Sequence, residues 1–130
     1  MKIIILLTLL LIASNVYAAD VVIETIAWES SGESFEGQIA VASVIKQRMI
    51  ERHKTAEEIV LQPHQFSCWK DGKTTQKRKL TKKELDNARK AWELAKPDGY
   101  NHYAVASCKP YWAKSSKYKK QTGKHIFYKL

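Results

Sequence analysis

The chain has 130 residues, with 22 Lys and Arg against 13 Asp and Glu and a formal net charge of +9 at pH 7. This length suffices for one hydrophobic core and excludes a chain of several domains. The charge predicts attraction to polyanions, although a merely soluble basic surface explains it equally well.

An apolar run opens the chain. Lys2 precedes residues 3–12, which are aliphatic except for Thr8, and the small residues Val16 and Ala18 follow. This order predicts a secretory signal peptide over residues 1–18 and one mature domain over residues 19–130. The run is shorter than the roughly 20 residues of a membrane span, so we expect no stable membrane insertion after cleavage. An uncleaved membrane tether is the alternative.

The predicted export bears on the redox state of the two cysteines, Cys68 and Cys108. An oxidising compartment favours pairing of an even set, so we predict a disulfide between them. It would close a loop of about 40 residues and stabilise the domain by roughly 3 to 4 kcal/mol. The alternatives are a free buried Cys68 and a thiol nucleophile working with His102 or His125, but neither His lies at a recognised spacing.

Hydrophobic periodicity predicts helices in the first half of the mature chain. Apolar residues recur at helical spacing over residues 21–29, and Gly32 ends that helix. Ser34 is expected to cap a longer helix over residues 35–52, which we predict to be the central core helix. Thr55 and Glu58 form a capping box for a short helix that ends before Pro63.

The second half alternates loops, one helix and β-prone segments. Residues 65–79 are predicted to be an extended loop with a turn at Asp71-Gly72. Thr81 and Glu84 make a second capping box for a helix that Pro97-Asp98-Gly99 ends. The β-prone residues 100–106 and 125–129 place Tyr103 and Phe127 on a small hairpin or sheet. The fold class is therefore mainly α (α+β), with a helical core and a short sheet in the C-terminal part.

Two carboxylates flank the end of the first helix. Glu29 directly follows an apolar helical run, and Glu33 comes four residues later, beyond Gly32. Desolvation at the end of an apolar helix raises the pKa of a Glu, and a general acid at neutral pH needs a raised pKa. Glu29 is therefore the candidate acid-base residue. The alternative is that both glutamates are solvated helix-end residues without chemistry.

Five segments, at residues 28–45, 65–68, 101–103, 110–114 and 123–128, follow one another in an order that resembles the bacterial cell-wall hydrolases of the spore cortex-lytic type. In that family a motif E-A-R-G-E precedes a small-residue helix containing E-G-Q-x-A-V-A, and residues 28–45 are similar to it. Gln65-Phe66-Ser67-Cys68 resembles the middle loop of the family. The C-terminal signature is matched by residues 101–103, 110–114 and 123–128. Together the blocks span nearly the whole mature chain.

The resemblance implies a lysozyme-like fold that cleaves peptidoglycan glycan strands between N-acetylmuramic acid and N-acetylglucosamine. Lytic transglycosylase chemistry is the implied form, with a hydrolytic muramidase as the alternative. The first glutamate of the family motif falls on Glu29, which becomes the general acid and base, while Glu33 positions substrate or caps the next helix. No cofactor or metal is expected. The compartment is then extracellular, periplasmic or the cell wall.

Further site residues follow from the blocks, each with core packing as the alternative. Ser30 is expected to orient Glu29 or to end its helix. Sugar rings are expected to stack on Phe66, Trp69, Tyr103 and Tyr128, and N-acetyl groups to bond Asn101 and His102. Glycan strands are the expected partner, with acidic wall polymers drawn to the basic surface; nucleic acid is not expected.

Two other functional classes remain open. A zinc amidase needs ligands around an open metal site, and the four histidines have wide spacings without a paired metal motif: His53, His64, His102 and His125. A non-enzymatic cationic wall binder fits the charge but leaves the glutamate motif unexplained. Its binding would weaken steeply with salt and release no soluble muropeptides.

Overall fold

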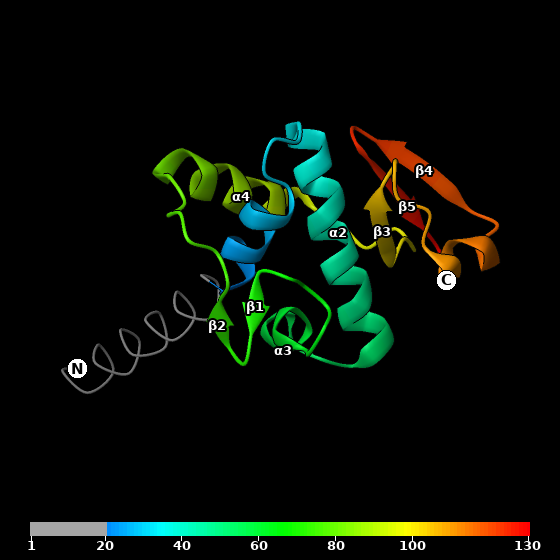
Figure 1. Cartoon of the computed structure of the whole chain (residues 1–130), viewed down its shortest axis with the longest axis horizontal. Coiled ribbons are helices and arrows are strands. Elements are labelled where there is room, and N and C mark those ends of the chain that lie inside the picture. Colours follow the sequence, from blue (N-terminus) through cyan, green and yellow to red (C-terminus); the bar gives the residue numbers. More distant parts are fainter. Residues whose placement is uncertain (1–20) are drawn as a thin grey trace, which may run out of the picture.

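The computed structural model describes residues 21–130, and the predicted signal peptide lies outside them. The described chain begins in a helix over residues 21–29 and continues through α2 (Phe35–Arg52) and α3 (Ala56–Leu61) to α4 (Lys82–Leu94). Figure 1 shows α2 through the middle of the molecule, with α4 on one side and the C-terminal sheet on the other. No helix within residues 21–130 is long and apolar enough to cross a membrane.

The first helix and α2 share the larger part of the core. Ile23 and Ile26 of the first helix are 2% and 0% exposed, and Ile45 of α2 is 0% exposed. The Ser34 hydroxyl accepts a hydrogen bond from the Gly37 N–H, which caps α2 as its sequence predicts. The predicted bounds of α2 are thereby confirmed, and burial of its apolar stripe makes it the central core helix.

Side-chain caps begin the two later helices. The Thr55 hydroxyl accepts from the Glu58 N–H at the start of α3, and Thr81 and Glu84 form the predicted capping box of α4. At the other end of α4, Lys46 Nζ lies 2.6 Å from the Trp92 carbonyl oxygen and 2.8 Å from that of Ala95. Lys46 therefore joins α2 to the carbonyl end of α4, where a cation is favoured.

The segment between α3 and α4 is more ordered than an extended loop. It holds a hairpin of β1 (Trp69–Lys70) and β2 (Lys73–Thr74), in which Trp69 pairs with Thr74. Asp71 and Gly72 form the predicted turn, with φ angles of 51° and 74°. Two successive residues at positive φ match the right-handed twist of paired strands, which explains why the turn closes a hairpin.

The C-terminal part is a three-stranded antiparallel sheet in the order β3-β5-β4. Its strands are β3 (His102–Val105), β4 (Lys119–Thr122) and β5 (His125–Tyr128), and the 3-10 helix η1 (Tyr111–Ser115) lies between β3 and β4. Tyr103 pairs with Phe127, and Phe127 packs against Val41 and Val44 of α2. The predicted mainly α fold with a small C-terminal sheet is confirmed.

The predicted disulfide is wrong, because both cysteines are free. Cys68 is 2% exposed in the core beside the first helix, whereas Cys108 is exposed in the turn after β3. The two residues thus belong to different parts of the fold, which a count of cysteines cannot reveal. Burial raises the pKa of the Cys68 thiol to about 12, which disfavours the thiolate that a nucleophile requires.

Candidate active site

Glu29 is the last residue of the first helix, where the chain turns sharply. The Ser30 N–H and hydroxyl both donate to the Ile26 carbonyl oxygen, and the Glu33 N–H donates to that of Ser30 at 2.9 Å. Gly32 adopts a φ of 78°, a conformation that favours glycine. The helix therefore ends at Glu29, and its buried apolar face fixes where the carboxyl lies.

The environment of Glu29 suits a proton donor. Burial raises the pKa of the Glu29 carboxyl, while a hydrogen bond from Tyr103 and the positive charge of Arg48 act against this rise. The Tyr103 hydroxyl donates to Glu29 Oε2 at 2.8 Å. Burial also raises the pKa of Tyr103 well above its usual value, so the phenol keeps its proton. Because Tyr103 occupies Oε2, Oε1 is the oxygen left for a substrate.

Arg48 supplies a buried positive charge to the same site. Its side chain is 6% exposed, Nε donates to the Asn101 carbonyl oxygen at 2.8 Å, and the guanidinium lies 5.4 Å from the centre of the Phe66 ring. Burial lowers the pKa of Arg48 from its usual value, but a guanidinium stays charged in proteins. The positive charge of Arg48 therefore favours the ionised form of the Glu29 carboxyl.

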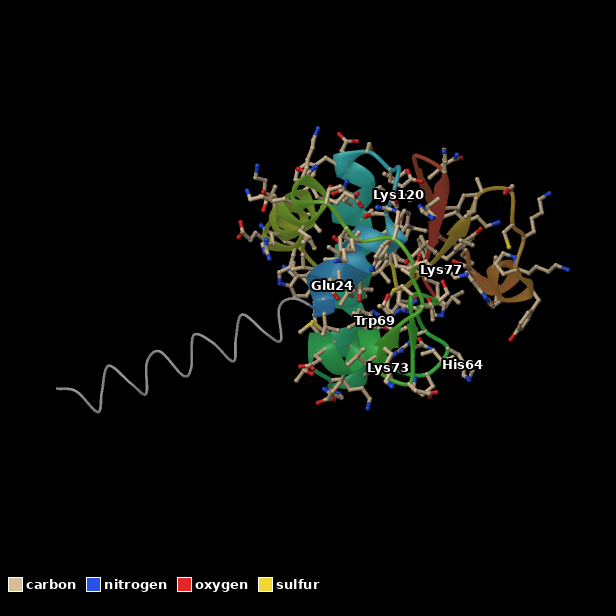
Figure 2. The ribbon with its side chains drawn as sticks, turned by 60° about the vertical axis from the view of Figure 1, so that its left-hand side comes forward. Glu24, His64, Trp69, Lys73, Lys77 and Lys120 are labelled. Atoms are coloured by element: carbon tan, nitrogen blue, oxygen red, sulfur yellow. The ribbon has the colours of Figure 1, made fainter. Side chains whose placement is uncertain are left out.

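A groove opens at Glu29. A pocket of about 270 Å³ is lined by Glu29, Arg48, His64, Gln65, Phe66, Ser67 and Tyr103. It shares His64, Phe66 and Ser67 with a neighbouring pocket of about 500 Å³, which Trp69 also lines. Figure 2 labels Trp69 and Lys73, which belong to the β1–β2 hairpin, and His64, which precedes it in the chain. The two pockets adjoin through these shared residues and form a groove that Trp69 and Tyr103 line.

Glu33 has a different environment from Glu29. Its side chain is 6% exposed, and Oε1 lies 3.2 Å from His125 Nδ1, within ion-pair distance but not aligned for a hydrogen bond. The Lys124 N–H donates to Oε2 at 3.4 Å. The Glu33 carboxylate is thus packed against the β4–β5 turn, and Glu29 is the carboxyl that lines the groove.

Comparison with known proteins gives the family. A model of the cell wall hydrolase family matches residues 32–128. The chain belongs to that family. It also resembles two solved structures from bacilli at 26% sequence identity over 85% of this chain. The catalytic domain of Bacillus cereus SleB is covered to 91% with a TM-score of 0.63. The catalytic domain of the germination-specific lytic transglycosylase SleB from Bacillus anthracis is covered to 93% with a TM-score of 0.64.

Among proteins with curated descriptions, none matches the chain significantly. The family match of this cell wall hydrolase begins at Gly32, three residues after Glu29. The candidate role of Glu29 therefore stands on its burial, its bond from Tyr103 and its place in the groove.

Three of the predicted site residues lie in this groove. Trp69 lines the larger pocket, and its Nε1–H donates to Thr25 Oγ1 at 2.7 Å, which fixes the indole against the first helix. Phe66 borders both pockets but is only 3% exposed, so its ring packs mainly in the core. Tyr103 lines the pocket as well, but its hydroxyl bonds Glu29. The structure therefore gives Tyr103 a contact with the carboxyl, where the sequence predicted a sugar platform.

Four other predicted site residues make their contacts with other parts of the protein and do not line the groove. Asn101 is 4% exposed and its amide bonds Glu51 and the backbone of Leu130, so it has no capacity for an N-acetyl group. Tyr128 is 4% exposed and meets the Trp112 ring edge-on at 5.3 Å. His102 pairs with Tyr128 across the strands, and its ring lies 5.1 Å from that of Trp112 at an angle of 55°. Ser30 is 1% exposed and ends the helix.

His102 and Tyr128 lie away from the groove for one physical reason. Neighbouring residues of a strand point to opposite faces, so Tyr103 and Phe127 face α2 and the site, whereas His102 and Tyr128 face η1. The sequence motif alone does not show which of its residues face the groove. The alternation of side chains along the strands decides this.

Sequence reasoning missed Arg48, His64 and Gln65. A signal existed, because position 48 follows Val44 and Ile45 by four and three residues and so falls on the buried stripe of α2. His64 and Gln65 had only the adjacent Phe66-Ser67-Cys68 block to mark them. His64 lines the pocket with a backbone φ of 62°.

Proposed function

We propose that this cell wall hydrolase cleaves the glycan strands of peptidoglycan between N-acetylmuramic acid and N-acetylglucosamine, with Glu29 as its single general acid and base. The observation that carries the proposal is a carboxyl whose pKa burial raises, at one end of an aromatic groove, held by Tyr103 and faced by Arg48. The likeness to a domain described as a germination-specific lytic transglycosylase supports the same chemistry.

In the proposed reaction, protonated Glu29 gives its proton to the glycosidic oxygen while the bond from the muramoyl C1 to that oxygen breaks. The leaving sugar departs with a free hydroxyl, and Glu29 becomes a carboxylate. This carboxylate then takes the proton of the muramoyl 6-hydroxyl as its oxygen bonds C1 and closes a 1,6-anhydro ring. Tyr103 and Arg48 stabilise the carboxylate between the two steps.

A hydrolytic muramidase is the alternative, with water in place of the 6-hydroxyl. Ordinary glycosidases use two carboxylates that flank the bond to be cut. Glu33 is packed against His125 and the β4–β5 turn, so it does not present a second carboxylate to the groove. This arrangement favours the single-carboxylate mechanism of a lytic transglycosylase.

Digestion of purified peptidoglycan in the presence of EDTA tests the proposal. We expect full activity, with soluble fragments that consist of disaccharides still bearing their peptides. A zinc amidase would instead free peptides from intact glycan and would stop when EDTA removes its metal. A cationic binder would release no fragments at any salt concentration.

Export is part of the proposed function, because peptidoglycan lies outside the cytoplasm. The apolar residues 3–12 supply the export signal, and we propose cleavage after Ala18 and action in the cell wall or periplasm.

We also propose that acidic wall polymers bind the C-terminal lysine surface, which consists of the lysines between Gly99 and Leu130. This segment contains seven lysines and no acidic residue: Lys109, Lys114, Lys117, Lys119, Lys120, Lys124 and Lys129. Within residues 21–130 none of the seven has an acidic side chain at ion-pair distance. Lys120 of β4 is labelled in Figure 2. Lysines without acidic partners suit a polyanion, because each presents a point charge to it.

The triple variant Lys117→Gln, Lys119→Gln, Lys120→Gln is expected to bind a polyglycerol phosphate polymer about ten-fold more weakly at low ionic strength. Its matched control is Lys83→Gln, Lys90→Gln, Lys96→Gln, which makes the same change of charge on and beyond α4, across α2 from the sheet (Figure 1). Titration calorimetry at several salt concentrations measures both. An equal loss in the two variants would show that only net charge matters.

A further inference from the structure

The carboxylate of Glu33 is a buried titratable group that the proposed reaction does not use. It lies in the loop after the first helix, and its partners belong to the C-terminal turn between β4 and β5. Glu33 is therefore a direct polar contact between the loop that follows Glu29 and the C-terminal sheet. A carboxylate that is 6% exposed needs such partners to offset its lost hydration.

Two glycines make room for this carboxylate. A Cβ at Gly123 would collide with Glu33 Oε2, and a Cβ at Gly37 would lie 3.1 Å from Glu33 Cβ. Gly123 also has a φ of 58°, which a side chain would strain. The Glu33 side chain is therefore closely packed against the turn and the start of α2.

The contact continues from Glu33 to Glu29 through two rings. His125 lies 3.2 Å from Glu33, and its ring meets Tyr103 edge-on with centres 5.2 Å apart and an angle of 80°. Tyr103 in turn donates its hydroxyl proton to Glu29 at 2.8 Å. Phe127 supports the same ring at 5.4 Å. The two glutamates are linked through packed side chains of β3 and β5.

We propose that Glu33 is a positioning residue that, by holding His125 against Tyr103, keeps the Tyr103 hydroxyl on Glu29. Its importance for catalysis rests on the proposed function, whereas the linkage itself is a property of the free protein. When Glu33 is neutralised, His125 loses its partner and the Tyr103 ring gains freedom. The bond to Glu29 then weakens, and the stabilisation of the carboxylate falls with it.

The direction in which the pKa of Glu29 changes distinguishes this linkage from simple charge repulsion between Glu29 and Glu33. The charged and titratable groups around Glu29 are Tyr103 of β3, Arg48 of α2, and His64 and Cys68 of the segment after α3. Loss of the negative charge of Glu33 would by itself lower the pKa of Glu29. Loss of the bond from Tyr103 raises that pKa, because this bond favours the carboxylate.

The test is the titration of the Glu29 carboxyl carbon by NMR in the free protein. We expect Glu33→Gln and Tyr103→Phe both to raise the pKa of Glu29, and Glu33→Gln to add nothing in the Tyr103→Phe background. Glu36→Gln, the same change at an exposed residue on the next helix, is expected to leave the titration unchanged. His125→Phe removes the nitrogen that faces Glu33 and is expected to act like Glu33→Gln.

Activity on peptidoglycan provides a second test of the linkage between Glu33 and Glu29. Glu33→Gln is expected to lower kcat about ten-fold with little change in KM, since a weakened bond to a charged group costs on the order of 1.5 kcal/mol. The alkaline limb of kcat/KM should move to higher pH, because a general acid with a raised pKa stays protonated further up the scale.

A fall in the pKa of Glu29 in Glu33→Gln, no change, or a shift that adds to that of Tyr103→Phe overturns the linkage. If Glu33→Gln does not fold, the same three outcomes apply to His125→Phe. A wild-type protein that does not cleave peptidoglycan, but shows the predicted titrations, contradicts the proposed function and leaves the linkage standing.

Discussion

The Glu29→Gln variant is expected to lose at least a thousand-fold in the release of soluble muropeptides, which is within the range for removal of a general acid. Glutamine has no proton to give to the glycosidic oxygen and cannot take one from the 6-hydroxyl. Its amide oxygen still accepts the bond from Tyr103, so the fold and the groove are preserved. Turbidity of a peptidoglycan suspension measures the rate, and thermal unfolding checks the fold.

Glu36→Gln is the matched control for this variant, because it makes the same chemical change at an exposed position of α2. It is expected to keep wild-type activity. A folded Glu29→Gln protein with more than a tenth of wild-type activity would contradict the assignment of Glu29 as the acid and base.

The second large effect is expected at Arg48. Arg48→Gln should lower kcat/KM by about ten- to hundred-fold, because the cation that favours ionised Glu29 is removed from a buried site. The pKa of Glu29 then rises, so the alkaline limb of the pH profile moves to higher pH while the maximal rate falls. Stability should also fall by about 1 to 3 kcal/mol, since the Asn101 carbonyl loses the donor Nε.

Two variants separate charge from packing at this position. Arg48→Lys keeps the charge but not the bond to Asn101, so it should keep the pH profile and lose stability. Arg52→Gln removes a charge one turn later, where Arg52 bonds the Gln62 and Gln65 side chains, and should leave the alkaline limb in place. An unchanged limb in Arg48→Gln would show that Arg48 does not act on Glu29.

Local signals in the sequence predicted most of the helices. Ser34, Thr55 and Thr81 each cap a helix where the sequence placed one, because a side-chain oxygen satisfies the first free N–H groups whatever the rest of the fold does. Asp71-Gly72 specified a turn for the same local reason. Whether that turn joined two strands depended on pairing between Trp69 and Thr74, which the loop composition did not reveal.

Predictions that depended on long-range contacts were less successful. A disulfide between Cys68 and Cys108 was predicted from the oxidising compartment and the even number of cysteines. In the structure Cys68 is buried in the core and Cys108 is exposed after β3. Asn101 was assigned to substrate, although it fastens Glu51 and the chain end at Leu130. Both errors concern which part of the fold a residue meets, and neighbours in sequence do not determine that.

The candidate site likewise combines a residue that local sequence predicted with contacts that only the fold brings together. Glu29 was predicted from the apolar helix before it, and the structure adds burial and a groove. Its partners Tyr103 and Arg48 lie far along the chain, and only the packing of β3 and α2 brings them to the carboxyl. The separation of Glu29 from Glu33 was predicted from Gly32, and the partner of Glu33 on β5 was not foreseen.

The central claim is that a single carboxyl, Glu29, cuts the glycan without water. The most direct measurement is the mass of the muropeptides that the wild-type protein releases from purified peptidoglycan. We predict that each released fragment ends in a 1,6-anhydro muramoyl sugar and is lighter by one water than the hydrolysed fragment. Fragments with a free reducing end would contradict the claim, because they require a water nucleophile.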